Sequence, residues 1–117
     1  MRKRWELRDK GRIALIRKLA GDPQAVRPTN TARQDMTRLR LTMAGVCEAI
    51  CDYIDGDAAV METITDTARG HIGRPAYEVY PTIDAEDLFV KVGIDKRRWG
   101  LVLILISVPE RQGRPSS

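Results

Sequence analysis

Residues 76–94, AYEVYPTIDAEDLFVKVGI, decide the type of fold because two β-rich runs flank a turn signal. The first run is residues 76–80 and the second is residues 87–94, both rich in the β-branched and aromatic residues that favour strands. Between them, Pro81-Thr82-Ile83-Asp84 has the composition of a turn. The stretch therefore predicts two neighbouring strands of one sheet.

The second run predicts a sheet whose two faces differ in chemistry. One face carries Leu88, Val90, Val92 and Ile94, because side chains alternate along a strand. The other face carries Phe89 and Lys91, and a lysine between two valines seldom lies in a small domain without solvent or an anion beside it. We expect the apolar face to pack against helices and the face of Phe89 and Lys91 to form a functional surface.

The chain before this stretch predicts helices. Residues 5–20 have a helical apolar stripe, and a short helix is expected after an N-cap at Thr29 or Asn30. The clearest helix begins after a Thr42 cap and ends at Gly56. Its apolar face contains Met43, Val46, Cys47, Ile50, Cys51 and Ile54.

Later segments of the chain change from a helical period to a period of two. Residues 60–67 predict a strand, residues 68–75 a loop and residues 95–100 a turn. Residues 100–108 are apolar on both faces and predict a central strand. The fold class expected is α+β, with N-terminal helices packed on one face of a mainly antiparallel sheet.

Size and composition indicate one domain without a metal or a cofactor. The chain has 117 residues, of which 43% are apolar, so we expect a single domain at residues 1–110 and a disordered tail at residues 111–117. No run is long enough to cross a bilayer and nothing resembles a signal peptide, so a cytoplasmic location is expected. Cys47 and Cys51 lie on one apolar helix face, and the single histidine, His71, is far from them in sequence.

Charge is distributed unevenly along the chain, whose net charge is +4. Eight of its twenty basic residues lie within residues 1–18: Arg2, Lys3, Arg4, Arg8, Lys10, Arg12, Arg17 and Lys18. Residues 41–68 contain no basic residue. Such asymmetry suits a polyanion on one side and a basic partner on the other, although a solvated charged surface explains any single charge equally well.

A surface of cations, tyrosines and a histidine, with no metal site, suits RNA cleavage by internal transesterification. A base removes the proton of the ribose 2′-OH, cations stabilise the phosphate, and an acid protonates the leaving 5′-oxygen. The residues suited to this chemistry are Arg69, His71, Arg74, Tyr77, Glu78, Tyr80 and Lys91. Simpler interpretations are that His71 is a surface loop residue, that either tyrosine packs at a sheet edge, and that Glu78 pairs with Lys91. Alternation predicts that Tyr77 and Tyr80 lie on opposite faces.

Five segments in succession resemble the MqsR family of bacterial type II toxins: LTMAGVCEAICDYI, VMETITD, AYEVYP, DLFVKVGI and LVLILISV. The resemblance covers about residues 26–108. It implies a fold similar to that of RelE toxins, mRNA endoribonuclease activity and a cognate antitoxin that silences it.

Within this resemblance only part of the family's active site has the same residue types. Lys91 matches, whereas Glu62 stands in the place of a functional lysine, Tyr77 of a functional glutamine and Phe89 of an active-site tyrosine. Pro109 stands where a basic residue usually follows the last strand. Other residues must then supply the proton transfer if this chain cleaves RNA.

The leading hypothesis is a toxin-like, metal-independent endoribonuclease that cleaves single-stranded mRNA and binds an antitoxin. The candidate catalytic residues are Tyr77, Lys91, His71 and Arg74, with Lys91 and Arg74 on the phosphate and Tyr77, or else His71, transferring protons. The candidate RNA-binding residues are Arg69, Tyr80, Phe89, Lys96 and Arg97. Two alternatives remain: a protein-interaction module on the same fold, and a nucleic-acid-binding protein that acts through residues 1–18.

Overall fold

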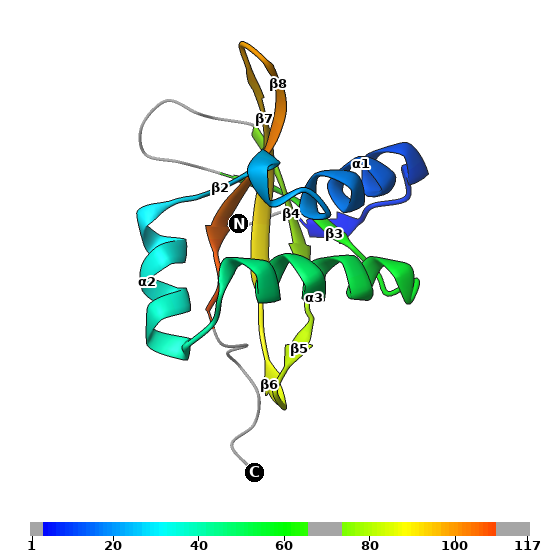
Figure 1. Cartoon of the computed structure of the whole chain (residues 1–117). Coiled ribbons are helices and arrows are strands. Elements are labelled where there is room, and N and C mark those ends of the chain that lie inside the picture. Colours follow the sequence, from blue (N-terminus) through cyan, green and yellow to red (C-terminus); the bar gives the residue numbers. More distant parts are fainter. Residues whose placement is uncertain (1–3, 66–73, 110–117) are drawn as a thin grey trace.

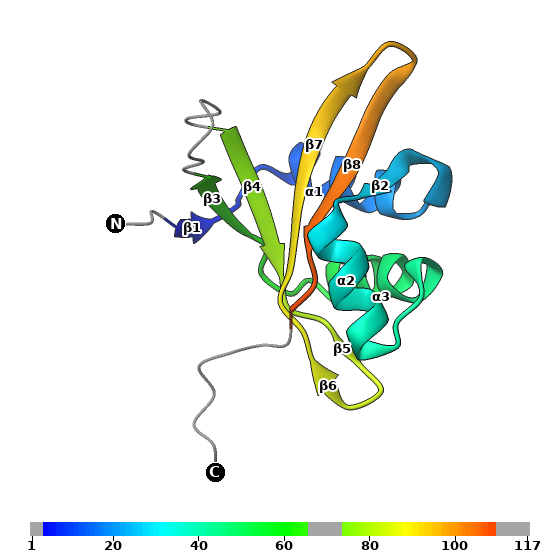
Figure 2. The same cartoon turned by 90° about the vertical axis from the view of Figure 1, so that its left-hand side faces the viewer.

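Three helices lie on one face of a six-stranded sheet (Figures 1 and 2). The structure is a computed structural model that describes residues 4–65 and 74–109. The helices are α1 (Lys10–Ala20), α2 (Asn30–Leu39) and α3 (Met43–Asp55), with a 3-10 turn, η1 (Pro23–Ala25). The strands are β1 (Arg4–Glu6), β2 (Val26–Pro28), β3 (Met61–Thr65), β4 (Arg74–Val79), β7 (Val90–Arg97) and β8 (Gly100–Ser107), and a small separate ladder contains β5 (Thr82–Ile83) and β6 (Glu86–Asp87).

The sheet has the order β1-β3-β4-β7-β8-β2. Its neighbouring strands are antiparallel except β2 and β8, which are parallel. The predicted class is thus confirmed: the fold is α+β with a mainly antiparallel sheet. We call the sheet face away from the helices the open face, because Figure 2 shows no described element on it.

Side-chain caps begin the three helices where the chain leaves an extended conformation. The side chains of Asp9, Thr29 and Thr42 accept hydrogen bonds from backbone N–H groups of Arg12, Ala32 and Gly45, respectively. The prediction of Thr29 or Asn30 as a cap is confirmed for Thr29, and the Thr42 cap is confirmed as well. The prediction of one helix over residues 5–20 is wrong, because the Asp9 cap starts α1 only at Lys10 and residues 4–6 pair with β3 instead.

The core fills the space between the helices and the sheet. Its largest fully buried apolar side chains come from α1, α3, β4, β7 and β8 and from positions just before strands, among them Ile16, Ile50, Leu88, Val90, Val92, Leu103 and Leu105. The predicted apolar face of the second β-rich run is therefore confirmed. Ile94 is only partly buried but packs against the same cluster.

The strand predicted over residues 87–94 is broken. Asp87 closes the small β5–β6 ladder, whose turn contains Asp84 and Ala85 with positive φ, and β7 begins only at Val90. β7 then continues to Arg97, so the predicted turn at residues 95–100 is wrong in extent. β7 and β8 form a long hairpin that projects beyond the rest of the sheet (Figure 1). The predicted tail at residues 111–117 lies outside the described residues.

Candidate functional site

A buried carboxylate forms the centre of a polar cluster on the open face. Glu78, on β4, has no exposed surface. Its Oε1 atom lies 2.7 Å from the Arg4 Nε atom, and its Oε2 atom accepts a hydrogen bond from Arg4 Nη2 at 3.3 Å. The Tyr80 hydroxyl donates a second hydrogen bond to Oε1, at 3.0 Å. Two oxygens of one carboxylate thus hold a guanidinium and a phenol, the kind of paired contact that a buried charge requires.

The strand register explains how Arg4 reaches Glu78 across an intervening strand. Arg4 lies opposite Thr63, and Thr63 lies opposite Ala76, two residues before Glu78 on β4. These residues share the open face because directly paired residues point the same way. Thr63 and Ala76 are short and fully buried, so the long arginine side chain can pass over them to the carboxylate.

Two aromatic rings border the Arg4–Glu78 pair. The Tyr80 and Phe89 rings meet edge to face, with centroids 5.4 Å apart, and the Arg4 guanidinium carbon lies 5.9 Å from the Phe89 centroid. Burial, together with the neighbouring Glu78 carboxylate, raises the pKa of the Tyr80 hydroxyl to about 12. Tyr80 is therefore a neutral hydroxyl at physiological pH, with its proton directed at Glu78.

Lys91 completes the cluster from the next strand. It lies directly opposite Glu78 on β7 and is half-buried. The pairing of β7 with β8 shifts between Lys91 and Val92, which is the geometry of a β-bulge, and Ser107 lies opposite Lys91. Bulges redirect side chains at sheet surfaces. The open face thus combines two cations, one carboxylate and two aromatic rings, the residues Arg4, Lys91, Glu78, Tyr80 and Phe89, which we call the open-face cluster.

The structure places Tyr77, the predicted proton-transfer residue, on the opposite face of the sheet from this cluster. Tyr77 is 2% exposed and belongs to the core between sheet and helices. Burial raises the pKa of its hydroxyl, whose charged neighbours Arg12, Glu62 and Asp9 lie at the start of α1 and on β3. Tyr80 instead hydrogen-bonds Glu78 on the open face, so the prediction that Tyr77 and Tyr80 lie on opposite faces is confirmed.

The positions that the MqsR resemblance aligns with an active site do not converge. Glu62 pairs directly with Tyr77 and shares its helix-covered face, whereas Phe89 and Lys91 belong to the open-face cluster. Pro109 accepts a backbone hydrogen bond from Phe89, at 3.0 Å, through its carbonyl oxygen. Two of the four departures from the family therefore lie on the opposite side of the sheet from the matching lysine.

The remaining predicted residues are scattered or undescribed. His71 and Arg69 lie outside the described residues, and for Arg74 only its backbone position at the start of β4 is described. Lys96 and Arg97 are exposed near the tip of the β7–β8 hairpin, and Arg97 forms an ion pair with Asp95 at 3.2 Å. The hairpin tip is thus separated along β7 from the cluster around Lys91 (Figure 1).

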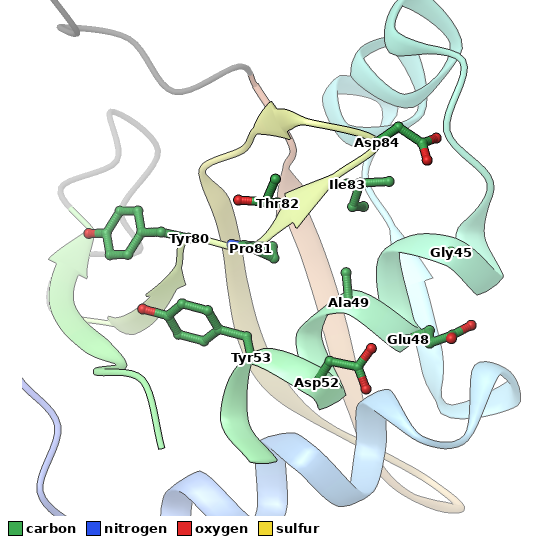
Figure 3. Close-up of a pocket in the computed structure, with 10 residues that line it drawn as sticks. All are labelled: Gly45, Glu48, Ala49, Asp52, Tyr53, Tyr80, Pro81, Thr82, Ile83 and Asp84. Atoms are coloured by element: carbon green, nitrogen blue, oxygen red, sulfur yellow. The ribbon is translucent and has the colours of Figure 1, made fainter. Parts of the chain in front are cut away.

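A cavity of about 550 Å³ lies beside Tyr80, between α3 and the β5 segment (Figure 3). The carboxylates of Glu48 and Asp52 project from α3, and Asp84 lies on the turn across from them. Three carboxylates without a basic residue among the lining residues repel phosphate. This cavity therefore does not suit RNA, and the open face remains the candidate site.

Sequence reasoning missed the role of Arg4, which forms an ion pair with Glu78. Arg4 was visible only as one member of the basic N-terminal cluster, because 74 residues separate it from Glu78. The available signal was the strand parity, since Glu78 and Tyr80 share a face when Tyr77 is buried. Among the described residues, no group of three histidine, cysteine or acidic side chains is placed to hold a metal ion.

Comparison with known proteins gives no relative: no family model, no curated protein and no solved structure matches this chain. In the described part of the chain, no helix has the length and apolar character needed to span a membrane.

Proposed function

We propose that the protein is a metal-independent endoribonuclease, the toxin of a type II toxin–antitoxin pair, which cleaves single-stranded RNA on the open face. The observation that supports this most is the open-face cluster, in which a carboxylate, two cations, a phenol and a second aromatic ring lie on a surface that no described helix covers. The resemblance to MqsR toxins supports the toxin role and a RelE-like fold, and the basic surplus of the chain suits a polyanionic substrate.

In this proposal the two cations hold the scissile phosphate and the rings hold a base. Arg4, whose side chain is 39% exposed, reaches Glu78 from β1 across β3, and Lys91 lies opposite Glu78 on the neighbouring strand β7. Their charges stabilise the additional negative charge that the phosphate acquires in the transition state. Phe89 offers a partly exposed ring for stacking, a contact that single-stranded RNA makes readily because its bases are unpaired.

The proton path that fits the geometry runs through Tyr80. Its hydroxyl donates to Glu78, so its oxygen can accept the proton of the ribose 2′-OH while its own proton passes to the carboxylate. The 2′-oxygen then forms a bond to phosphorus as the bond from phosphorus to the 5′-oxygen breaks. The Lys91 ammonium donates a proton to the leaving 5′-oxygen. The products are a 2′,3′-cyclic phosphate and a 5′-hydroxyl, and neither a metal nor water enters the step.

The test is cleavage of labelled single-stranded RNA in excess chelator, combined with expression of the protein alone in bacteria. We expect growth arrest and a 2′,3′-cyclic phosphate product, and no cleavage where the ribose lacks its 2′-OH. Lys91→Ala, Glu78→Gln and Tyr80→Phe should each slow cleavage on the order of 100-fold. Glu86→Gln, an exposed carboxylate on β6, should cleave at the wild-type rate. Absence of cleavage by the wild-type protein on any RNA would refute the enzymatic role.

A second candidate, RNA binding without cleavage, is favoured by the way Glu78 is held. Both of its oxygens contact Arg4, and the residue has no exposed surface, as in a purely structural ion pair. In this case Lys91→Ala and Phe89→Ala weaken RNA binding, while no variant changes the RNA product. The same assay therefore separates the two functions.

A further inference from the structure

A groove of about 740 Å³ lies between the projecting β7–β8 hairpin and the end of α1. Its apolar walls are formed by Leu15, Leu19, Ala25, Trp99, Leu101 and Val102. Its other lining residues include Lys18, Arg27 and Asp22. We call this space the hairpin groove. It lies on the helix-covered side of the sheet, since residues of α1 form one wall.

One side of the hairpin groove is a strand edge that β2 leaves uncovered. β2 pairs with β8 only from Val26, opposite Leu103, to Pro28, opposite Leu105. Continuing this parallel register would place residues 23–25 opposite residues 100–102, but residues 23–25 form the 3-10 turn η1. Pro23 begins this turn and has no backbone N–H to offer a neighbouring strand. No described strand therefore pairs with the groove side of residues 100–102.

Two large apolar side chains beside this edge are exposed to solvent. Trp99 is 71% exposed and Leu101 is 42% exposed. Natural proteins usually protect strand edges with charges, proline or a covering segment, because an apolar edge attracts another strand. Large apolar side chains beside an unpaired edge mark an interaction surface.

The charge of the rim indicates what kind of chain fits. Lys18 and Arg27 are the basic lining residues, against the single acidic residue Asp22. The Arg27 guanidinium donates hydrogen bonds to the carbonyl oxygens of Gln24 and Val26, which holds the cation at the rim. Opposite charges across an interface orient the partner and speed association.

We propose that the hairpin groove binds an extended, acidic segment of a partner protein, which adds a strand beside residues 100–102. Alternate side chains of that segment, the apolar ones, would contact Leu101 and Trp99, and the acidic ones would face Lys18 and Arg27. A polypeptide fits better than a nucleic acid, because the walls are mostly aliphatic and a backbone edge hydrogen-bonds a peptide. This inference is independent of RNA cleavage on the open face.

The test uses a fluorescein-labelled, end-capped peptide of eight residues that alternates valine with glutamate. Fluorescence anisotropy should show binding at least about tenfold tighter than that of a matched peptide that alternates valine with lysine. Two N-methylated versions of the valine–glutamate peptide are then compared, one methylated at every valine nitrogen and the other at every glutamate nitrogen. One version should bind about tenfold more weakly, because an added strand uses alternate backbone N–H groups as donors. Amide hydrogen exchange should slow at residues 100–102 in the complex.

Variants of the whole chain locate the site. Leu101→Ser and Lys18→Glu should each weaken peptide binding, whereas Arg33→Glu, a charge reversal on the exposed surface of α2, should leave it unchanged. RNA cleavage is measured on the same samples, so a loss of peptide binding is distinguishable from a loss of catalysis. The proposal is overturned if the peptide does not bind, if both peptides bind equally, or if an oligouridylate ten nucleotides long slows exchange at residues 100–102 in place of the peptide.

Discussion

Replacing Arg4 by methionine tests whether the open-face cluster is built around a buried ion pair. The change removes the guanidinium that contacts both oxygens of Glu78 and keeps an apolar stem of similar shape. The carboxylate then keeps its hydrogen bond from the Tyr80 hydroxyl. Breaking a fully buried ion pair from one side costs about 3–5 kcal/mol, because the other charge stays buried.

The expected effect is smaller than that limit because the pair is buried on one side only. Glu78 has no exposed side-chain surface, but 39% of the Arg4 side chain is exposed. Water can therefore approach the carboxylate once the guanidinium is gone. We expect Arg4→Met to lower the free energy of unfolding by about 1–3 kcal/mol, the range for a buried polar group that loses a partner.

A double-mutant cycle isolates the ion pair from other effects of the substitution. In Arg4→Met with Glu78→Gln no buried charge remains, so the two changes together should cost less than the sum of the single changes. A coupling free energy of about 1–2 kcal/mol is expected for residues in such contact.

Urea unfolding at pH 7 measures these free energies, followed by far-ultraviolet circular dichroism because Trp5 lies next to the substituted residue and its fluorescence would change. Arg33→Met, on the exposed surface of α2, is the control and should change the free energy by less than about 0.5 kcal/mol. An unchanged urea midpoint for Arg4→Met, with an unchanged slope, would show that Glu78 is not held in a buried pair.

Three further predictions concern the cap of a helix, the thiol of Cys47 and the hydroxyl of Tyr80. Thr42→Ala should lower the free energy of unfolding by about 1 kcal/mol in the same assay, because the Thr42 side chain accepts the Gly45 N–H at the start of α3. Burial raises the pKa of the Cys47 thiol to about 11, so a disulfide reagent at pH 8 should label it only after urea unfolds the chain. Burial likewise raises the pKa of Tyr80 from 10.0 to about 12. Between pH 10 and pH 12 the unfolded chain loses this proton while the folded protein keeps it, so the free energy of unfolding falls as pH rises, and Tyr80→Phe should reduce that fall.

Local signals in the sequence predicted the elements and their apolar faces well. The alternation in the second β-rich run placed Leu88, Val90 and Val92 in the core, where all three are fully buried. The Thr42 cap and the end of α3 at Gly56 follow from residue types at the helix ends. These features depend on neighbours within a few residues, so the sequence contains the information directly.

Contacts between distant segments could not be predicted in the same way. Residues 4–6 form the separate strand β1, and not the first turn of α1, because they pair with β3. The sequence around residue 5 does not indicate this pairing. The Arg4–Glu78 pair depends on the order of three strands in the sheet, which local patterns do not determine. Tyr77 was assigned to the functional surface by its place in a resembling motif. In the structure it pairs with the buried Val92, whereas Glu78 pairs with Lys91, so Tyr77 faces the core and Glu78 faces the other side of the sheet.

Glu78→Gln separates a catalytic carboxylate from a structural one, because its expected effects on RNA binding and on cleavage have opposite signs. The negative charge of Glu78 repels a phosphate and partly offsets the charge of the Arg4 guanidinium that binds this phosphate in the proposed complex. Glutamine keeps nearly the same shape without that charge, so RNA should bind a few-fold more tightly to the variant, as filter binding in chelator would show. If Glu78 takes the proton that Tyr80 relays, cleavage must at the same time fall on the order of 100-fold, since a neutral amide cannot accept it. A folding defect would weaken both activities together, so it cannot imitate this result. Tighter binding with an unchanged rate of cleavage would remove Glu78 from the reaction and leave it as the anchor of Arg4.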